Sequence, residues 1–180
     1  MMAKPNVVML ALLLSMVLSA DCYAASVTIE DAFSPDQGAT ALVVKAIGES
    51  RESIRVAAYS FTSRPIAQSL IDACDRGVDI RIVFDKSQHA NSFLKRFFDA
   101  SCVQTRMNDR YAIMHNKFMI IDGITLETGS FNFTKAAERR NSENVLVIHD
   151  DPQLVKDYMQ QWENLWQQGK DFTLQPDHKH

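Results

Sequence analysis

The sequence has little cysteine and no cluster of cysteine and histidine that would bind a metal. Its 180 residues include three cysteines, with no CxxC pair, so a structural zinc site has no support. Six Gly and five Pro are too few for a collagen-like or low-complexity chain, and 46% hydrophobic with 23% charged residues excludes a disordered one. The remaining possibility is a globular protein of the size of one domain.

Positive charge is not in excess either. Nineteen Lys and Arg are opposed by 22 Asp and Glu, a net charge of −3, so the molecule as a whole does not attract a polyanion such as nucleic acid. The average conceals an uneven distribution. Residues 104–140 hold six basic and four acidic residues, a local charge of +2, whereas residues 141–180 have a local charge of −4. Any attraction to a polyanion must therefore be local.

Long apolar runs are absent except at the N-terminus. The run Val7–Ala20 has 14 residues, fewer than the roughly 20 that a membrane span needs. Small residues at Cys22 and Ala24 then stand at the −3 and −1 positions of a cleavage site. We expect residues 1–24 to be a cleaved signal peptide and residues 25–180 to form one periplasmic or secreted domain without a stable membrane anchor. An uncleaved anchor or a buried N-terminal helix is the alternative.

Two cysteines, Cys74 and Cys102, remain after this processing. In an oxidising compartment they form either one disulfide or two buried thiols, because the sequence does not supply the Cα separation that decides between these states.

Helical and strand-like patterns alternate along the chain. Apolar spacing predicts helices over residues 39–47, 65–74, 89–100 and about 152–168, and strands over residues 27–29, 53–61, 78–84, 117–121, 124–128 and 145–148. Pro65 begins the second helix and Gly77 ends it. This alternation, without an internal repeat, predicts an α/β sandwich in a single domain.

One group of polar residues has the makings of phosphate chemistry. His115 and Lys117 are two residues apart, so on a strand they project to the same face, and Ser130 and Asn132 repeat this spacing. A neutral imidazole can attack phosphorus if a carboxylate, here Glu143, fixes its tautomer. Lys117 and Asn132 can stabilise the charge on the non-bridging oxygens. Since no cluster of acidic residues indicates a two-metal site, we expect chemistry without a metal or another cofactor.

Each of these residues alone is weak evidence, but together they form a pattern. His115-x-Lys117-x4-Asp122 followed by Gly129-Ser130-x-Asn132 resembles the HKD signature of the phospholipase D superfamily. Shorter segments at residues 33–35, 59–62, 76–80 and 141–144 are similar to the single-motif, Nuc-like branch of bacterial endonucleases. The resemblance extends from about Val27 to Trp166.

The resemblance implies a mixed β-sheet flanked by helices on both faces, and a two-step phosphodiesterase. One HKD histidine would form a phosphohistidine, and a second would protonate the leaving oxygen. Lys117, Ser130 and Asn132 would bind phosphate and Glu143 would orient the histidine, while Asp122 would have a supporting hydrogen-bond or ion-pair role.

The chain contains a single HxK motif. We therefore predict a homodimer in which two copies share one active site. Whether Glu143 orients His115 of its own chain or that of the partner stays open.

The motif alone does not decide the substrate. The local positive charge favours a sequence-nonspecific endonuclease acting on DNA and also RNA, with Arg110, Lys135 and Arg139 as candidate substrate contacts. A phospholipase D or cardiolipin-type phospholipid hydrolase is the alternative, and it would need an exposed apolar surface. A non-catalytic nucleic-acid-binding protein would leave the set of His115, Lys117, Asn132 and Glu143 unexplained.

Overall fold

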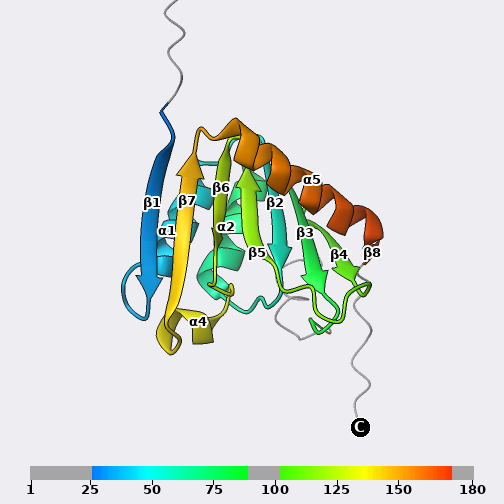
Figure 1. Cartoon of the computed structure of the whole chain (residues 1–180), viewed down its shortest axis with the longest axis horizontal. Coiled ribbons are helices and arrows are strands. Elements are labelled where there is room, and N and C mark those ends of the chain that lie inside the picture. Colours follow the sequence, from blue (N-terminus) through cyan, green and yellow to red (C-terminus); the bar gives the residue numbers. More distant parts are fainter. Residues whose placement is uncertain (1–25, 89–101, 172–180) are drawn as a thin grey trace, which may run out of the picture.

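A mixed β-sheet forms the centre of the computed structural model, which describes residues 26–88 and 102–171 (Figure 1). Its eight strands lie in the order β1-β7-β6-β5-β2-β3-β4-β8. Strands β2, β3 and β4 run parallel to one another, and the other neighbouring pairs are antiparallel. The strands are β1 (Thr28–Ser34), β2 (Ser53–Ala58), β3 (Asp79–Asp85), β4 (Gln104–Asn108), β5 (Lys117–Ile121), β6 (Thr125–Gly129), β7 (Glu143–His149) and β8 (Lys170–Asp171).

Helices cover both faces of this sheet. Helices α1 (Ala39–Glu49) and α2 (Arg64–Asp75) pack on one face, α5 (Pro152–Gln168) crosses the other, and the short α4 (Lys135–Arg139) lies at one end of the strands (Figure 1). The predicted sandwich of a mixed sheet with helices on both faces is confirmed.

The helices form where sequence patterns favour them. Pro65 stands in the first turn of α2, where its missing N–H leaves no helical bond unmade. Gly77, with a φ of 94°, follows the end of α2 in the left-handed conformation that glycine adopts readily. Helix α5 starts after Asp151, whose carboxylate accepts a hydrogen bond from the backbone N–H of Leu154 at 3.0 Å.

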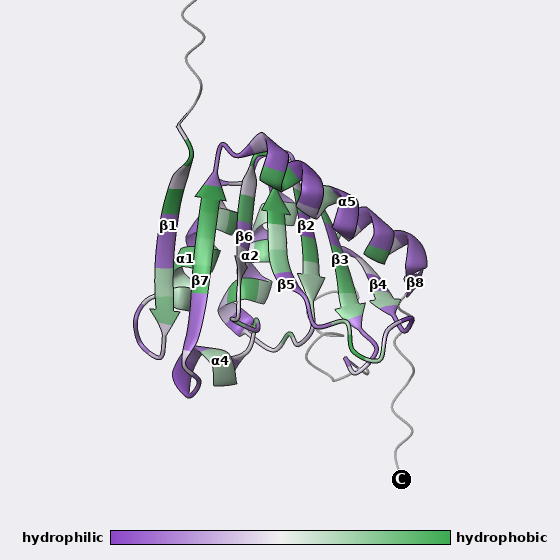
Figure 2. Cartoon of the chain, viewed as in Figure 1, coloured by the Kyte–Doolittle hydropathy of each residue, from purple (hydrophilic) through white to green (hydrophobic). Residues whose placement is uncertain are grey.

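Two apolar cores lie on opposite sides of the sheet. The larger core packs α1 and α2 against residues such as Val56, Ile82 and Val147. The smaller one packs the inner face of α5 against Phe118, Leu126 and other side chains of the sheet, and Figure 2 shows that the outer side of α5 is hydrophilic while the central strands are apolar. Burial on both faces explains why these strands are continuous apolar runs in the sequence.

Trp162 of α5 is buried, and its indole N–H donates to the carbonyl of Val56 at 2.9 Å. Its ring stacks on Trp166 with centroids 5.2 Å apart. Both residues therefore have packing roles in α5.

Several predicted boundaries differ from the structure. The strand predicted over 53–61 ends at Ala58. The N–H of Tyr59 makes one more bond, to the carbonyl of Asn116, and the chain then turns away to α2. The strand carrying the motif begins at Lys117, so His115 precedes it. The predicted signal peptide and the helix predicted over 89–100 lie outside the described residues.

Cys74, at the end of α2, forms a disulfide with Cys102, and their Cα atoms are 6.1 Å apart. That separation lies within the usual range for a disulfide. Of the two states that the sequence leaves open, the structure has the bonded one.

Candidate active site

The polar residues of the predicted motif gather at one end of the sheet. Strand β6 runs antiparallel to both β5 and β7, so the start of β5, the end of β6 and the start of β7 lie side by side (Figure 1). The end of β2 lies there as well, because Ala58 pairs with Lys117. This topology brings together residues that are separated by more than eighty positions in the chain.

His115 and Lys117 both contact the ring of Tyr59, which directly follows β2. The rings of Tyr59 and His115 have centroids 4.5 Å apart and are tilted by 56°. Lys117 Nζ lies 5.0 Å from the centroid of the Tyr59 ring, within cation–π distance. The tyrosine therefore fixes the imidazole and the ammonium on one aromatic surface, while the His115 side chain stays exposed.

Lys117 is a cation held almost out of solvent. The residue is 8% exposed, and its Nζ donates to the carbonyl of His115 at 2.7 Å. Burial lowers the pKa of the Lys117 ammonium, and the nearby Glu143 carboxylate opposes that shift. A partly desolvated cation beside an exposed imidazole can bind the charged oxygens of a phosphate.

Glu143, the first residue of β7, is held by two neighbours. Its Oε2 accepts a hydrogen bond from the Ser130 hydroxyl at 2.6 Å, and its Oε1 accepts one from the Asn141 amide at 3.0 Å. Among the described residues it makes no hydrogen bond to His115. The Ser130 hydroxyl also accepts a bond from Asn144 N–H at 3.1 Å, so its single proton is committed to Glu143.

A glycine allows this approach of β6 and β7. A Cβ added at Gly129 would overlap the backbone carbonyl of Asn144. The close approach also lets the N–H of Ser130 donate to that carbonyl at 3.1 Å. Gly129 in the motif is therefore a requirement of packing.

Asn132 lies two residues beyond Ser130, in the loop between β6 and α4. Its side-chain oxygen is buried and has no hydrogen-bond partner in the part of the chain that the structure describes. The backbone carbonyl of the same residue accepts a bond from Thr134 N–H at 2.6 Å. A buried side-chain oxygen without a hydrogen-bond partner is rare in a protein interior and more typical of a binding site.

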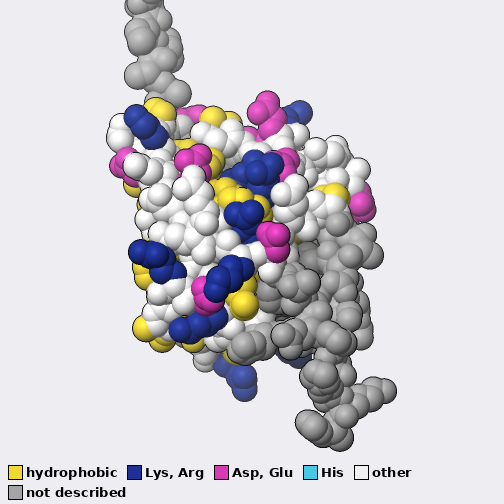
Figure 3. Space-filling view, turned by 90° about the vertical axis from the view of Figure 1, so that its right-hand side faces the viewer, with side chains coloured by type: hydrophobic (Ala, Val, Ile, Leu, Met, Phe, Trp, Pro, Cys, Tyr) yellow, Lys and Arg dark blue, Asp and Glu magenta, His cyan; other side chains and the backbone are white. Residues whose placement is uncertain are grey.

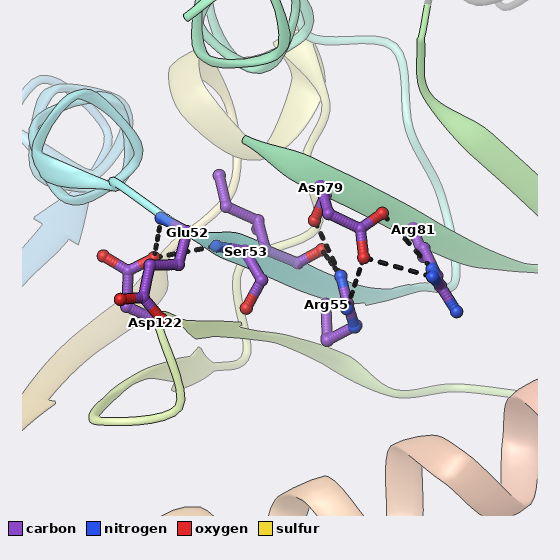
Figure 4. Close-up of polar contacts among 7 residues, drawn as sticks. Glu52, Ser53, Arg55, Asp79, Arg81 and Asp122 are labelled. Atoms are coloured by element: carbon purple, nitrogen blue, oxygen red, sulfur yellow. Dashed lines mark hydrogen bonds and ion pairs between the residues drawn. The ribbon is translucent and has the colours of Figure 1, made fainter. Parts of the chain in front are cut away.

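Asp122 lies at the opposite end of β5 from Lys117. Its carboxylate accepts a hydrogen bond from the backbone N–H of Arg51 at 2.9 Å. It also accepts bonds from the N–H groups of Glu52 and Ser53 at 2.8 and 2.9 Å (Figure 4). It thereby attaches the β5–β6 turn to the chain that enters β2. The structure thus separates Asp122 from the other five predicted catalytic residues, His115, Lys117, Ser130, Asn132 and Glu143.

Two residues without a predicted role support the site. Tyr59 is the first, and the signal for it was the segment 59–62, which is similar to the Nuc-like branch. The second is Asp85, the last residue of β3, whose side chain is buried and accepts bonds from Ser87 N–H at 2.8 Å and Met114 N–H at 2.6 Å. Burial raises the pKa of Asp85, but these hydrogen bonds outweigh burial and the net shift is downward. The ionised carboxylate holds the residue that precedes His115.

The candidate substrate contacts lie in two places. Lys135 and Arg139 are exposed on α4, which follows the Ser130–Asn132 segment directly. Arg110 is exposed in the loop that leads to His115, and its N–H donates to the Asn108 side chain at 3.1 Å. None of the three forms an ion pair with another described residue.

The basic residues at the β4–β8 edge differ in this respect. Figure 3 shows Lys and Arg side chains over this edge with acidic side chains between them. Arg106 pairs with Asp171 at 3.3 Å, and Lys170 pairs with Asp109 at 2.6 Å. These two basic residues are therefore compensated, unlike Arg110, Lys135 and Arg139.

Two kinds of feature are absent from residues 26–88 and 102–171. No three His, Cys, Asp or Glu side chains among them come together as a metal site. No helix in this part of the chain is long and apolar enough to cross a membrane.

Comparisons with known proteins converge on one family. A family model described as "Cardiolipin synthase, PLD-like domain" matches residues 43–166. A phospholipase D from Rickettsia bellii is 38% identical over 135 residues, which is 74% of this chain and 67% of that protein. A mitochondrial cardiolipin hydrolase from Chlamydomonas reinhardtii is 34% identical over 69% of this chain and 56% of its own length.

Solved structures agree with these matches. Nuc from Salmonella typhimurium, described as a phospholipase D family member, is 39% identical, with a TM-score of 0.78 over 82% of this chain and 99% of that one. NucT from Helicobacter pylori has a TM-score of 0.74 at 24% identity, which shows the shared fold.

Proposed function

The chain belongs to the phospholipase D superfamily of phosphodiesterases, and from this premise we propose that it is a sequence-nonspecific endonuclease acting on DNA and also RNA. One observation carries the choice of substrate. The polar group around His115 and Lys117 lies at the same end of the sheet as Lys135 and Arg139 of α4, which are exposed and form no ion pair with another described residue. Unpaired cations beside a phosphodiesterase site favour a substrate with many phosphates.

In the proposed reaction a ring nitrogen of His115 attacks the phosphorus. A P–N bond forms while the P–O bond to the leaving group breaks, and the leaving oxygen takes a proton from a second histidine. Lys117 and the Asn132 amide N–H groups stabilise the charge on the non-bridging oxygens. Water then attacks the phosphohistidine, gives its proton to the second histidine and restores both groups.

The second histidine comes, in this proposal, from a second copy of the chain. One HxK motif per chain requires two chains for the two roles. An exposed apolar surface next to the motif supports this arrangement, since Tyr111 is 39% and Ile113 is 56% exposed just before His115. A two-fold axis there would place two His115 side chains in one site.

The proposal also concerns the orienting carboxylate. Within one chain Glu143 is occupied by Ser130 and Asn141 rather than by His115. Ser130 then acts by holding Glu143 rather than by donating to phosphate.

We further infer that the mature protein works in the periplasm or outside the cell. The short apolar run Val7–Ala20 supports cleavage and export. The Cys74–Cys102 disulfide supports an oxidising compartment.

The test incubates the mature protein with plasmid DNA, with RNA and with cardiolipin vesicles, each in excess EDTA. We expect nicking of DNA that persists in EDTA and falls by about 10³-fold or more in His115→Ala. Arg51→Ala, an exposed residue at the other end of the sheet, is the control and should keep full activity. Nicking that survives in His115→Ala would refute the mechanism.

A phospholipid hydrolase is the second candidate. It is favoured by the names of the Rickettsia and Chlamydomonas relatives, and the exposed Tyr111 and Ile113 would then contact lipid rather than a partner chain. Hydrolysis of the vesicles without cleavage of DNA or RNA would establish this candidate and reject the nuclease.

A further inference from the structure

A cavity beside the candidate active site has the features of an anion site. Its volume is about 480 Å³, and it lies between the start of α2 and the helix α4. The charged side chains that line it are Arg64, Lys135, Arg139 and Glu138. Three cations against one carboxylate make this cavity positive, and none of the three cations forms an ion pair with another described residue.

The start of α2 contributes unused hydrogen-bond donors. Helix α2 has 12 residues, and Ser63 stands at its N-cap position without making a side-chain capping bond. The first N–H groups of a helix have no partner within it, and they carry partial positive charge. In α2 these groups belong to Arg64 and Ile66, since Pro65 has no N–H. An uncapped helix start of this length favours an anion in front of it.

Ser63 supplies a second and independent observation. The residue is 1% exposed and lines the cavity, yet its hydroxyl has no hydrogen-bond partner among the described residues. A buried hydroxyl without a partner is costly, and serine at this position normally caps its own helix. A bound anion would satisfy both the hydroxyl and the helix start.

Backbone hydrogen bonds join the cavity to the loop between β6 and α4, which carries Asn132. The carbonyl of Phe133 accepts hydrogen bonds from Thr62 N–H at 2.8 Å and Ser63 N–H at 2.9 Å. Phe133 directly follows Asn132, so the cavity and the Asn132 side chain are joined through one short segment. A polynucleotide whose scissile phosphate contacts Lys117 and Asn132 would pass this cavity.

We propose that this cavity, formed by Ser63, Arg64, Lys135 and Arg139, binds a phosphate of the nucleic-acid strand flanking the scissile phosphate. The inference rests on the proposed nuclease function and adds a second phosphate subsite to it. Arg64 and Lys135 supply charge, and Ser63 with the start of α2 supplies directed hydrogen bonds. The subsite acts on substrates that are long enough to reach it, and it has no part in the chemical step.

The test compares a long and a short substrate in four variants. Arg64→Ala, Lys135→Ala and Ser63→Ala are measured against Lys156→Ala, which removes an exposed lysine of α5. The substrates are a 20-nucleotide single strand and bis(4-nitrophenyl) phosphate, which has one phosphate and cannot occupy two sites. For the oligonucleotide we expect KM to rise about fivefold in Arg64→Ala and Lys135→Ala, with unchanged kinetics on the short ester.

Salt dependence and folding complete the design. Each lost cation should reduce the slope of log KM against log salt by about 0.7, the value for one single-strand phosphate contact. Ser63→Ala should raise the oligonucleotide KM without changing that slope, because it removes a neutral donor. Equal thermal midpoints of the wild type and the four variants would show that the fold is intact.

Three outcomes would overturn the inference. Unchanged oligonucleotide KM in Arg64→Ala and Lys135→Ala, with DNA still cleaved, rejects the subsite alone. An effect of the two cations without one of Ser63→Ala reduces the cavity to a diffuse basic surface and also rejects it. A wild-type protein that hydrolyses the short ester but cleaves no nucleic acid rejects the nuclease proposal and the subsite with it.

Discussion

Lys117 shows how single residues are prepared for function in this protein. Its ammonium is held by the His115 carbonyl and the Tyr59 ring, at a position that is 8% exposed. Burial weakens competition from water, so a phosphate oxygen would meet a cation that is already positioned. The chain pays for this with a desolvated charge, which the Glu143 carboxylate offsets.

Glu127 is a second buried charge-bearing residue, without a place in the proposed mechanism. It lies on β6, is 1% exposed, and both of its carboxylate oxygens lack a hydrogen-bond partner among the described residues. Burial raises the pKa of Glu127 well above its ordinary value. The folded protein therefore keeps this carboxyl protonated at a pH where the unfolded chain has lost the proton.

This predicts a dependence of stability on pH. Since the folded pKa is raised, the contribution of Glu127 to stability is fully present below its unfolded pKa and is lost as pH rises towards the folded pKa, by at most about 1.4 kcal/mol per pH unit. Glu127→Gln cannot lose a proton, so urea unfolding at pH 5, 6.5 and 8 should show the variant gaining on the wild type as pH rises. A stability difference that is constant over this range would contradict the prediction.

Polar anchors join the elements at the far end of the sheet. Asp122 attaches the β5–β6 turn to the start of β2 through three backbone N–H groups. Beside it Arg55 of β2 bonds to Asp79 of β3 at 2.6 Å, and Arg81 bonds to the same carboxylate at 3.2 Å (Figure 4). Burial raises the pKa of Asp79, but its bonds to Arg55 and Arg81 outweigh burial and lower it.

We predict that Asp122→Ala destabilises the fold without affecting catalysis directly. Loss of three hydrogen bonds to a carboxylate should reduce the free energy of unfolding by about 2 kcal/mol or more. Asp122→Asn should cost less, because its amide oxygen still accepts bonds and asparagine tolerates the φ of 53° found here. Urea unfolding together with kcat well below the melting temperature checks this. A stable Asp122→Ala protein with greatly reduced kcat would contradict it and make Asp122 catalytic.

At the scale of the whole molecule, the chain is short and contains a single HxK motif. The apolar surface at Tyr111 and Ile113 lies within a few residues of His115, so in our proposal association and catalysis depend on the same surface. A monomer would then fold normally and yet lack the second histidine.

We predict that Ile113→Asp makes the protein monomeric and inactive, because a carboxylate at a paired apolar contact is desolvated without a partner. Sedimentation velocity should show a halved mass, and plasmid nicking should be lost. Ile124→Asp is the matched control, since Ile124 is 57% exposed in the β5–β6 turn near Asp122. A monomeric Ile113→Asp protein with normal activity would rule out the shared site.

The sequence by itself determined the class of fold and the motif. Apolar runs predict buried strands and apolar residues at helical spacing predict amphipathic helices, because both patterns depend only on local geometry. The spacing of the motif residues from His115 to Asn132 is likewise visible in the sequence. The separation of Asp122 from the site could not be predicted, because its hydrogen bonds to backbone groups far away in the chain leave no local pattern. Tyr59, Asp85 and the cavity at Ser63 were likewise decided by the tertiary structure, which brings strands far apart in the chain to one end of the sheet. Whether a polar residue binds substrate or holds its neighbour depends on which partners the fold brings within hydrogen-bond distance.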